Sequence, residues 1–112
     1  MEKNTNPMNG LGRNAGTAVL ILSSLADGEK HGYALVKDVE GFAGVHIAPG
    51  TLYEALARLE AQRLIEPVES NDRRRPYRLT SGGASVLSEY LAAQQRVIKV
   101  GQARLKTGWS FA

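Results

Sequence analysis

Residues 48–67 read APGTLYEALARLEAQRLIEP, and this stretch decides the fold. Pro49 suits the first turn of a helix, where the missing N–H of proline has no partner in any case. Leu52, Leu56 and Leu59 then recur at helical spacing and form one narrow apolar stripe. The opposite face carries short and polar side chains, which leave room for the close approach of another molecule. The stretch therefore predicts a short helix with an open polar face.

Two short β-like runs follow this helix directly. Residues 64–69 (LIEPVE) and 77–80 (YRLT) flank the polar turn SNDRRRP at 70–76, and such runs around a turn predict a β-hairpin. A helix followed at once by a basic hairpin is the layout of a winged helix-turn-helix. In that fold the helix enters the major groove of DNA and the hairpin reaches the flanking backbone.

Helical segments are also expected before residue 48. Residues 15–26 carry a broad apolar stripe closed by an Asp-Gly pair, and residues 33–39 form a second amphipathic helix that ends at Glu40-Gly41. His31, in the turn between these helices, is interpreted as a structural residue. Residues 45–47 predict a short strand. With two scattered histidines and no cysteine, no metal site is predicted.

The C-terminal part of the chain predicts a long helix from residue 81 to about residue 106, with Thr80 as its cap. Two apolar stripes run along it. One can pack on the core of its own domain, and the other requires a second surface, most simply a second copy of the chain. The alternative is one wide stripe that covers the N-terminal helix only. The predicted dimer-interface side chains are Leu87, Leu91, Ile98 and Leu105.

Five motifs, in this order and spacing, resemble the PadR-like family of bacterial and archaeal transcriptional regulators. The motifs are HGY at 31–33, PGTLY at 49–53, LARLE at 56–60, LIE at 64–66 and YRLT at 77–80. The resemblance covers roughly residues 15–105. One departure is Arg63, where family members usually have a glycine that ends the helix. Arg63 must therefore adopt an uncommon backbone angle, or the helix must end differently.

The expected fold class is α+β and mostly helical, a winged helix-turn-helix with a long C-terminal dimerisation helix. Three parts are expected along the chain: a flexible N-terminal tail over 1–13, a winged-helix DNA-binding domain over 14–80, and the dimerisation helix and tail over 81–112. A chain of 112 residues is long enough for one hydrophobic core.

Charge and composition narrow the class of protein further. The net charge is +3, divided as −2 over residues 1–62, +2 over 63–80 and +3 over 81–112, so the basic charge collects in the hairpin and the last segment. The sequence has no cysteine, no apolar run of about 18 residues and no signal-peptide pattern, which favours a cytoplasmic protein without membrane association. No catalytic or phosphate-loop motif is present, so neither enzymatic activity nor a cofactor is expected.

The predicted DNA contacts come from the helix and the hairpin. Three alternatives stay open: the ring of Tyr53 packs on the hairpin instead, Glu54 and Arg58 form an ordinary surface ion pair, or the arginine run is only a solvated face. The residues predicted to contact DNA are Thr51, Tyr53, Glu54, Arg58, Arg73, Arg74 and Arg75.

The expected function is that of a repressor that binds an inverted-repeat operator in double-stranded DNA as a homodimer. The family resemblance further implies release by a small-molecule effector, with Trp109 as a contact for a flat ligand. The alternative for Trp109 is a plain hydrophobic anchor for the tail. The alternative function is a winged-helix module that docks on proteins and does not bind DNA sequence-specifically.

Overall fold

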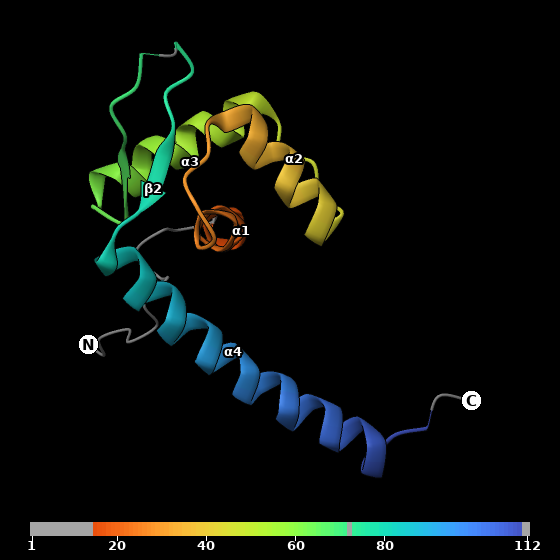
Figure 1. Cartoon of the computed structure of the whole chain (residues 1–112). Helices are drawn as coiled ribbons and strands as arrows, with labels where there is room; N and C mark the ends of the chain where they lie inside the picture. Colours follow the sequence, from red (N-terminus) through yellow and green to blue (C-terminus); the bar gives the residue numbers. More distant parts are fainter. Residues whose placement is uncertain (1–14, 72, 111–112) are drawn as a thin grey trace.

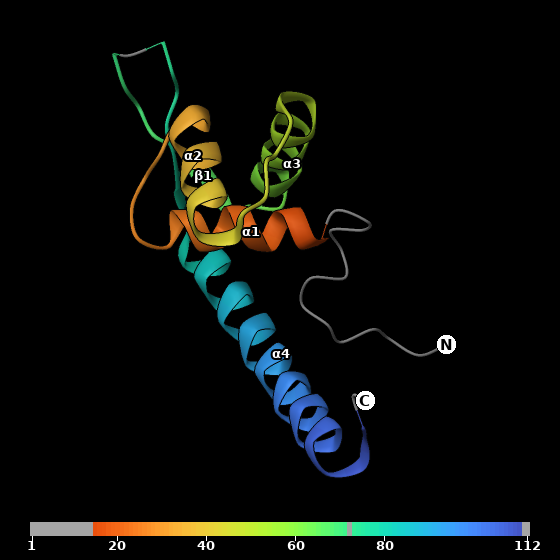
Figure 2. The same ribbon diagram turned by 90° about the vertical axis from the view of Figure 1, so that its right-hand side faces the viewer.

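A computed structural model describes residues 15–71 and 73–110; the predicted N-terminal tail lies outside these ranges. The described residues form α1 (Ala15–Leu25), α2 (Gly32–Ala43), α3 (Pro49–Ala61), β1 (Ile65–Pro67), β2 (Tyr77–Leu79) and α4 (Ser81–Gly108). Helix α1 lies centrally, with α2 and α3 on one side and the start of α4 on the other (Figure 1, Figure 2). The predicted mostly helical winged-helix fold with a long C-terminal helix is confirmed.

The hydrophobic core lies where the apolar stripes of the first three helices meet. Ile21 and Leu22 of α1, Leu35 of α2 and Leu56 of α3 are all at most 1% exposed. Burying side chains of this size contributes about 1.5–3 kcal/mol each to folding. This core fixes α3 by its leucine stripe, so the opposite face of α3 remains open to solvent.

Helix α2 is longer than the sequence predicted. It continues through Gly41 to Ala43, and the stop is Gly44, whose φ of 67° places it in the left-handed region. The Gly44 amide donates to the carbonyl oxygen of Glu40 at 3.0 Å. A glycine ends a helix where its backbone turns left-handed, and Gly41 does not. The predicted strand at 45–47 is wrong, because this segment is a loop that buries Ile47 in the core.

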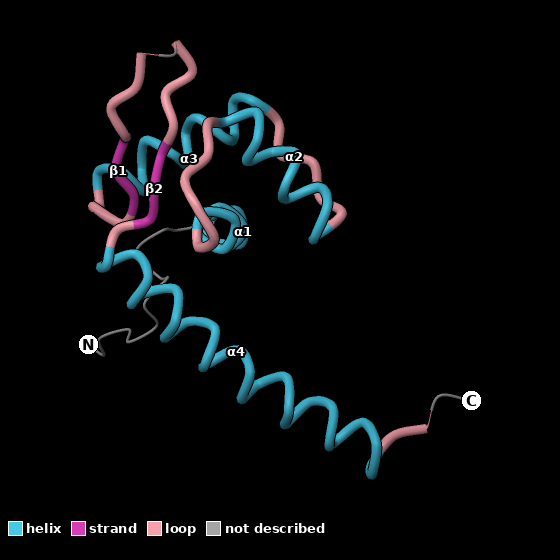
Figure 3. The backbone as a smooth tube through the Cα atoms, in the orientation of Figure 1, coloured by secondary structure: helices cyan, strands magenta, loops and turns pink. Residues whose placement is uncertain are grey.

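The hairpin forms with the expected antiparallel pairing. Glu66 of β1 lies opposite Arg78 of β2, and their side chains form an ion pair at 2.7 Å. On its other edge β2 pairs with the loop between α1 and α2, where Lys30 and Tyr77 form an isolated antiparallel bridge. In Figure 3 the loop between α1 and α2 runs beside β2. The loop therefore adds a single bridging residue beside β2.

The end of α3 explains the unusual Arg63. Its φ is 62°, the only non-glycine residue with positive φ in the described part of the chain. The Leu64 amide donates to the carbonyl oxygen of Leu59 at 3.0 Å, and the Arg63 amide donates to that of Glu60 at 2.9 Å. These two bonds define a Schellman ending, which normally uses glycine at this position. Of the two sequence-based alternatives, the uncommon backbone angle is therefore the one observed.

Replacing Arg63 by glycine is expected to raise the free energy of unfolding by about 0.5–1 kcal/mol. The left-handed conformation costs a side-chain-bearing residue about 1–2 kcal/mol, and the greater freedom of glycine in the unfolded chain offsets part of this gain. Urea unfolding measures the change. The matched control is Gln62→Gly, where φ is −89° and glycine should destabilise instead. Equal destabilisation by both changes would contradict the assignment.

The junction between the hairpin and α4 is tightly held. The Thr80 hydroxyl accepts a hydrogen bond from the Gly83 amide at 2.9 Å, so Thr80 caps α4 as predicted. The same hydroxyl donates to the carbonyl oxygens of Arg63 and Leu64, at 2.8 and 3.0 Å. Gly83 is buried against the Leu64 carbonyl. The first turn of α4 is thereby fixed to the end of α3.

Candidate nucleic-acid interface

The N-terminal end of α3 is open to solvent. Its N-cap, Ala48, makes no side-chain hydrogen bond, and the first bond of the helix runs from the Leu52 amide to the Ala48 carbonyl at 2.9 Å. The amides of Gly50 and Thr51 precede that bond and point along the positive end of the helix dipole. Both residues are exposed. These amides can donate hydrogen bonds to a phosphate oxygen.

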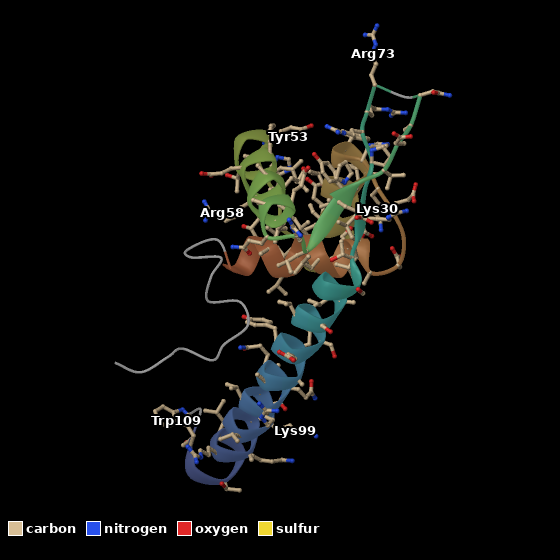
Figure 4. The ribbon with its side chains drawn as sticks, turned by 90° about the vertical axis from the view of Figure 1, so that its left-hand side faces the viewer. Lys30, Tyr53, Arg58, Arg73, Lys99 and Trp109 are labelled. Atoms are coloured by element: carbon tan, nitrogen blue, oxygen red, sulfur yellow. The ribbon has the colours of Figure 1, made fainter. Side chains whose placement is uncertain are left out.

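Beside this end of α3 lies the wing, defined here as residues 68–71 and 73–76. Its foot is closed by a hydrogen bond from the Val68 amide to the Pro76 carbonyl at 2.9 Å. Arg73, Arg74 and Arg75 are all exposed. Figure 4 shows Arg73 at the tip of the wing, pointing away from the body of the domain. The wing thus carries three guanidinium groups to the side of α3 that the core leaves free.

Tyr53 and the wing arginines line one cleft of about 320 Å³, called the wing cleft below. Tyr53 is 60% exposed, so its ring and its phenol hydroxyl are not buried in the core. Tyr77 forms part of the floor. Burial, and then the charge of Glu60, raise the pKa of the Tyr77 phenol, while the nearby Arg75 guanidinium acts in the opposite direction. The residues lining the cleft are His31, Gly32, Tyr33, Tyr53, Arg73, Arg74, Arg75 and Tyr77.

Glu54 and Arg58 lie on α3 outside the wing cleft. Their side chains form an i, i+4 ion pair with 3.8 Å between Nη2 and Oε2. Figure 4 shows Arg58 farther along α3 than Tyr53. Such exposed helix pairs contribute about 0.3–0.5 kcal/mol, so this geometry fits an ordinary surface pair as well as a pre-oriented base contact.

The structure adds residues around the start of α2 that the site prediction omitted. The His31 side chain caps α2 by accepting from the Ala34 amide at 3.3 Å, which gives His31 the structural role expected of it. Gly32 lets α2 approach α3, because a Cβ there would lie 3.2 Å from the Tyr53 hydroxyl. The Tyr33 ring is 66% exposed. The sequence signal for these residues is the HGY motif at 31–33.

The far half of α4 presents apolar side chains that the described residues leave uncovered. Leu91, Ile98 and Leu105 are each 46–48% exposed and follow one another at seven-residue spacing. The prediction that Leu87 lies in the dimer interface is corrected here. Leu87 is 6% exposed and is packed in the core of its own domain. It lies on the first turns of α4, which rest on α1 and β2. Trp109 follows the last turn of α4 and is 65% exposed.

Residues 15–71 and 73–110 contain neither a metal-binding cluster nor a membrane-spanning helix. In these ranges no three His, Asp or Glu side chains gather to form a metal site. None of the helices there combines the length and the apolar character needed to cross a membrane.

The fold and this surface define a winged-helix protein with a basic wing. The model of the transcriptional regulator PadR-like family matches residues 21–89. The chain therefore belongs to the PadR-like family of transcriptional regulators, which confirms the resemblance predicted from the five motifs.

The chain is also similar to two other proteins and to a solved structure. The chain is 43% identical over 79 residues to an uncharacterised 37.1 kDa protein in transposon TN4556 of Streptomyces fradiae, covering 70% of this chain and 23% of that protein. It is 40% identical over 72 residues to the transcriptional regulator Rv3488 of Mycobacterium tuberculosis, covering 62% and 66%. The crystal structure of a PadR family transcriptional regulator from Eggerthella lenta superposes with a TM-score of 0.67 at 35% identity, covering 90% of each chain.

Proposed function

We propose that this regulator is a repressor that binds an inverted-repeat operator in double-stranded DNA as a homodimer. In this proposal α3 enters the major groove, and Arg73, Arg74 and Arg75 contact phosphates beside it. The observation that carries the proposal is the wing cleft, because it brings Tyr53 of α3 together with the three wing arginines. Cations placed beside an inserted helix are the electrostatic footprint of DNA binding.

Side chains along α3 supply the proposed contacts. The Thr51 hydroxyl and the amides beside it would hold one phosphate, and the Tyr53 phenol would contact a phosphate or a base edge. Arg58 would read a guanine or contact a phosphate, with Glu54 orienting its guanidinium. Phosphate contacts fix the register of the protein on DNA, and contacts to base edges supply the preference for one sequence.

Fluorescence anisotropy with the DNA fragment upstream of the protein's own gene and with a scrambled fragment of equal length tests this function. Preference for the native fragment across a salt series supports a sequence-specific regulator. A specific site is typically bound at least about 1,000-fold more tightly than nonspecific DNA. Equal weak binding to both fragments would overturn the proposal and would favour a protein-docking module.

The proposed dimer rests on the far half of α4. A contiguous row of half-exposed leucine and isoleucine side chains is costly in water, and a second copy of α4 would cover it. Leu91, Ile98 and Leu105 form the proposed contact, with Leu87 left to the core of each subunit. Two subunits joined in this way would present their α3 helices to successive major grooves, about 34 Å apart. A planar effector at Trp109 would act by changing the angle between the subunits.

Ile98→Glu is expected to weaken the dimer at least about 100-fold, because it places a carboxylate in an apolar contact. Sedimentation velocity at micromolar concentration should then show a monomer where the wild type shows a dimer. Ala103→Glu is the matched control: it adds the same charge to an exposed position on the opposite side of α4 and should leave the dimer intact. A dimer that survives Ile98→Glu would contradict this interface.

A further inference from the structure

The side chain of Lys30 is mostly buried, and its ammonium group lies among several oxygen atoms. Only 16% of it is exposed, and its ammonium contacts the Asp27 carboxylate and the Ser24 carbonyl oxygen, both at 2.5 Å. The Gly28 carbonyl lies at 3.5 Å and the Asp38 carboxylate at 4.0 Å. A lysine that binds the last carbonyls of a helix satisfies groups that have no partner within the helix. Lys30 thereby closes the C-terminal end of α1.

These contacts join two helices to the turn between them. Ser24, 1% exposed on α1, donates to the Asp38 carboxylate of α2 at 2.7 Å. The hydrogen bond and charge of Lys30 lower the pKa of the Asp27 carboxyl. A lowered pKa means that the contact is complete at neutral pH and is lost only as the pH falls through that lowered value. The contacts that join the turn to α1 and α2 are the Lys30 ammonium with Asp27 and Ser24, and the Ser24 hydroxyl with Asp38.

The backbone of Lys30 connects the same turn to the wing. Its amide donates to the Tyr77 carbonyl at 3.1 Å, and the Tyr77 amide donates to the Lys30 carbonyl at 2.9 Å. Tyr77 comes immediately after the wing and lines the wing cleft beside Arg75. Figure 4 shows Lys30 near the foot of the wing. One residue thus holds α1 with its side chain and β2 with its backbone.

We propose that Lys30 is a positioning residue for DNA binding: it sets the wing against α3 and fixes where the three arginines lie. This inference rests on the proposed function, because it assigns a role in DNA binding by the wing. Apart from Lys30, the wing is held by a ladder of three residue pairs and by the bond from the Val68 amide to the Pro76 carbonyl. Such a short hairpin is only marginally stable alone, so the additional pairing at Lys30 limits its movement. A held wing loses less conformational freedom when it binds DNA.

The test is a double-mutant cycle on DNA affinity. Lys30→Met keeps the apolar stem and removes the ammonium. It is expected to weaken binding to the upstream fragment about 3- to 10-fold in the wild-type background. In a protein that already carries Arg73→Ala, Arg74→Ala and Arg75→Ala, the same change should alter affinity by less than about 1.5-fold, because the wing then has little to contribute. Lys30→Arg, which keeps a cation with several donors, should restore binding to within about twofold of wild type.

Controls separate positioning from the loss of one charge. Lys99→Met removes an exposed lysine on α4, distant from the wing, and its small effect should be the same in both backgrounds (Figure 4). Asp27→Asn, at an 80% exposed side chain, perturbs the contact gently and serves if Lys30→Met fails to fold. An equal Lys30→Met penalty in both backgrounds, or no penalty in either, would overturn the proposal.

Hydrogen exchange supplies a readout that does not depend on DNA. The amides of Lys30 and Tyr77 bond to each other's carbonyls, so Lys30→Met should speed their exchange at least about fivefold, while amides within α3 keep their rates. If the wild type shows no DNA preference, the proposed function fails, and exchange at Tyr77 still reports whether Lys30 holds the foot of the wing. Unchanged exchange at Tyr77 would overturn the inference by itself.

Discussion

Gly83→Ala should lower the free energy of unfolding by about 3 kcal/mol, a large share of the stability of a domain this size. A Cβ at residue 83 would overlap the carbonyl oxygen of Leu64 and would lie 2.8 Å from Cδ1 of Leu79. That carbonyl accepts hydrogen bonds from both the amide and the hydroxyl of Thr80, at 3.1 and 3.0 Å, so it cannot move aside without losing them. The junction must therefore open to admit one methyl group.

The neighbouring glycine supplies the matched control. A Cβ at residue 82 would meet its nearest heavy atoms at 3.7 and 3.8 Å, which is ordinary van der Waals contact. Gly82→Ala should then be neutral or stabilise by as much as about 1 kcal/mol, because alanine favours a helix over glycine. Thermal and urea unfolding of both variants decide the matter. Similar stabilities for the two would show that the close contact at Gly83 does not matter.

Replacing Arg73, Arg74 and Arg75 together by alanine should weaken binding to the native fragment roughly 10- to 100-fold at low salt. Each phosphate contact that is lost removes about 0.9 from the slope of log affinity against log salt, so the slope should flatten by as much as about 2.7. The fold should be unaffected, since the three side chains are exposed. Anisotropy titrations over a salt series, run beside circular dichroism, measure both effects.

A second triple variant controls for the loss of three positive charges. Arg96→Ala, Lys99→Ala and Lys106→Ala together remove equal charge from exposed positions on the polar side of α4. Charge loss far from the groove weakens long-range attraction but removes no phosphate contact, so this slope should change much less. If both triple variants flatten the slope equally, the wing arginines make no phosphate contacts of their own.

Local signals allowed much of the fold to be predicted from the sequence. Pro49 and the three-leucine stripe located α3, and Thr80 located the start of α4. These two predictions depend on near neighbours along the chain, which a sequence displays directly. The unusual backbone angle of Arg63 was expected only from the family resemblance, because family members usually have a glycine at that position.

Features that depend on tertiary contacts were missed. The sequence placed Lys30 in a turn, since nothing local shows that its backbone pairs with Tyr77, 47 positions later. The end of α2 was misplaced because Gly41 and Gly44 look alike in sequence and differ only in backbone angle. In the candidate site, the sequence identified α3 and the arginines, but the share of the wing cleft formed by His31 and Tyr33 depends on packing.

The length of α4 has a mechanical consequence. Its 28 residues extend about 42 Å as a single helix from the Thr80 cap. A rod of that length turning by about 5° at its fixed end displaces its far end by almost 4 Å, about the width of one base-pair step along DNA. The close contact of Gly83 with Leu64 lies at this fixed end. In the proposed dimer, small rotations there would be amplified into a mismatch between the two α3 helices and the helical repeat of the operator.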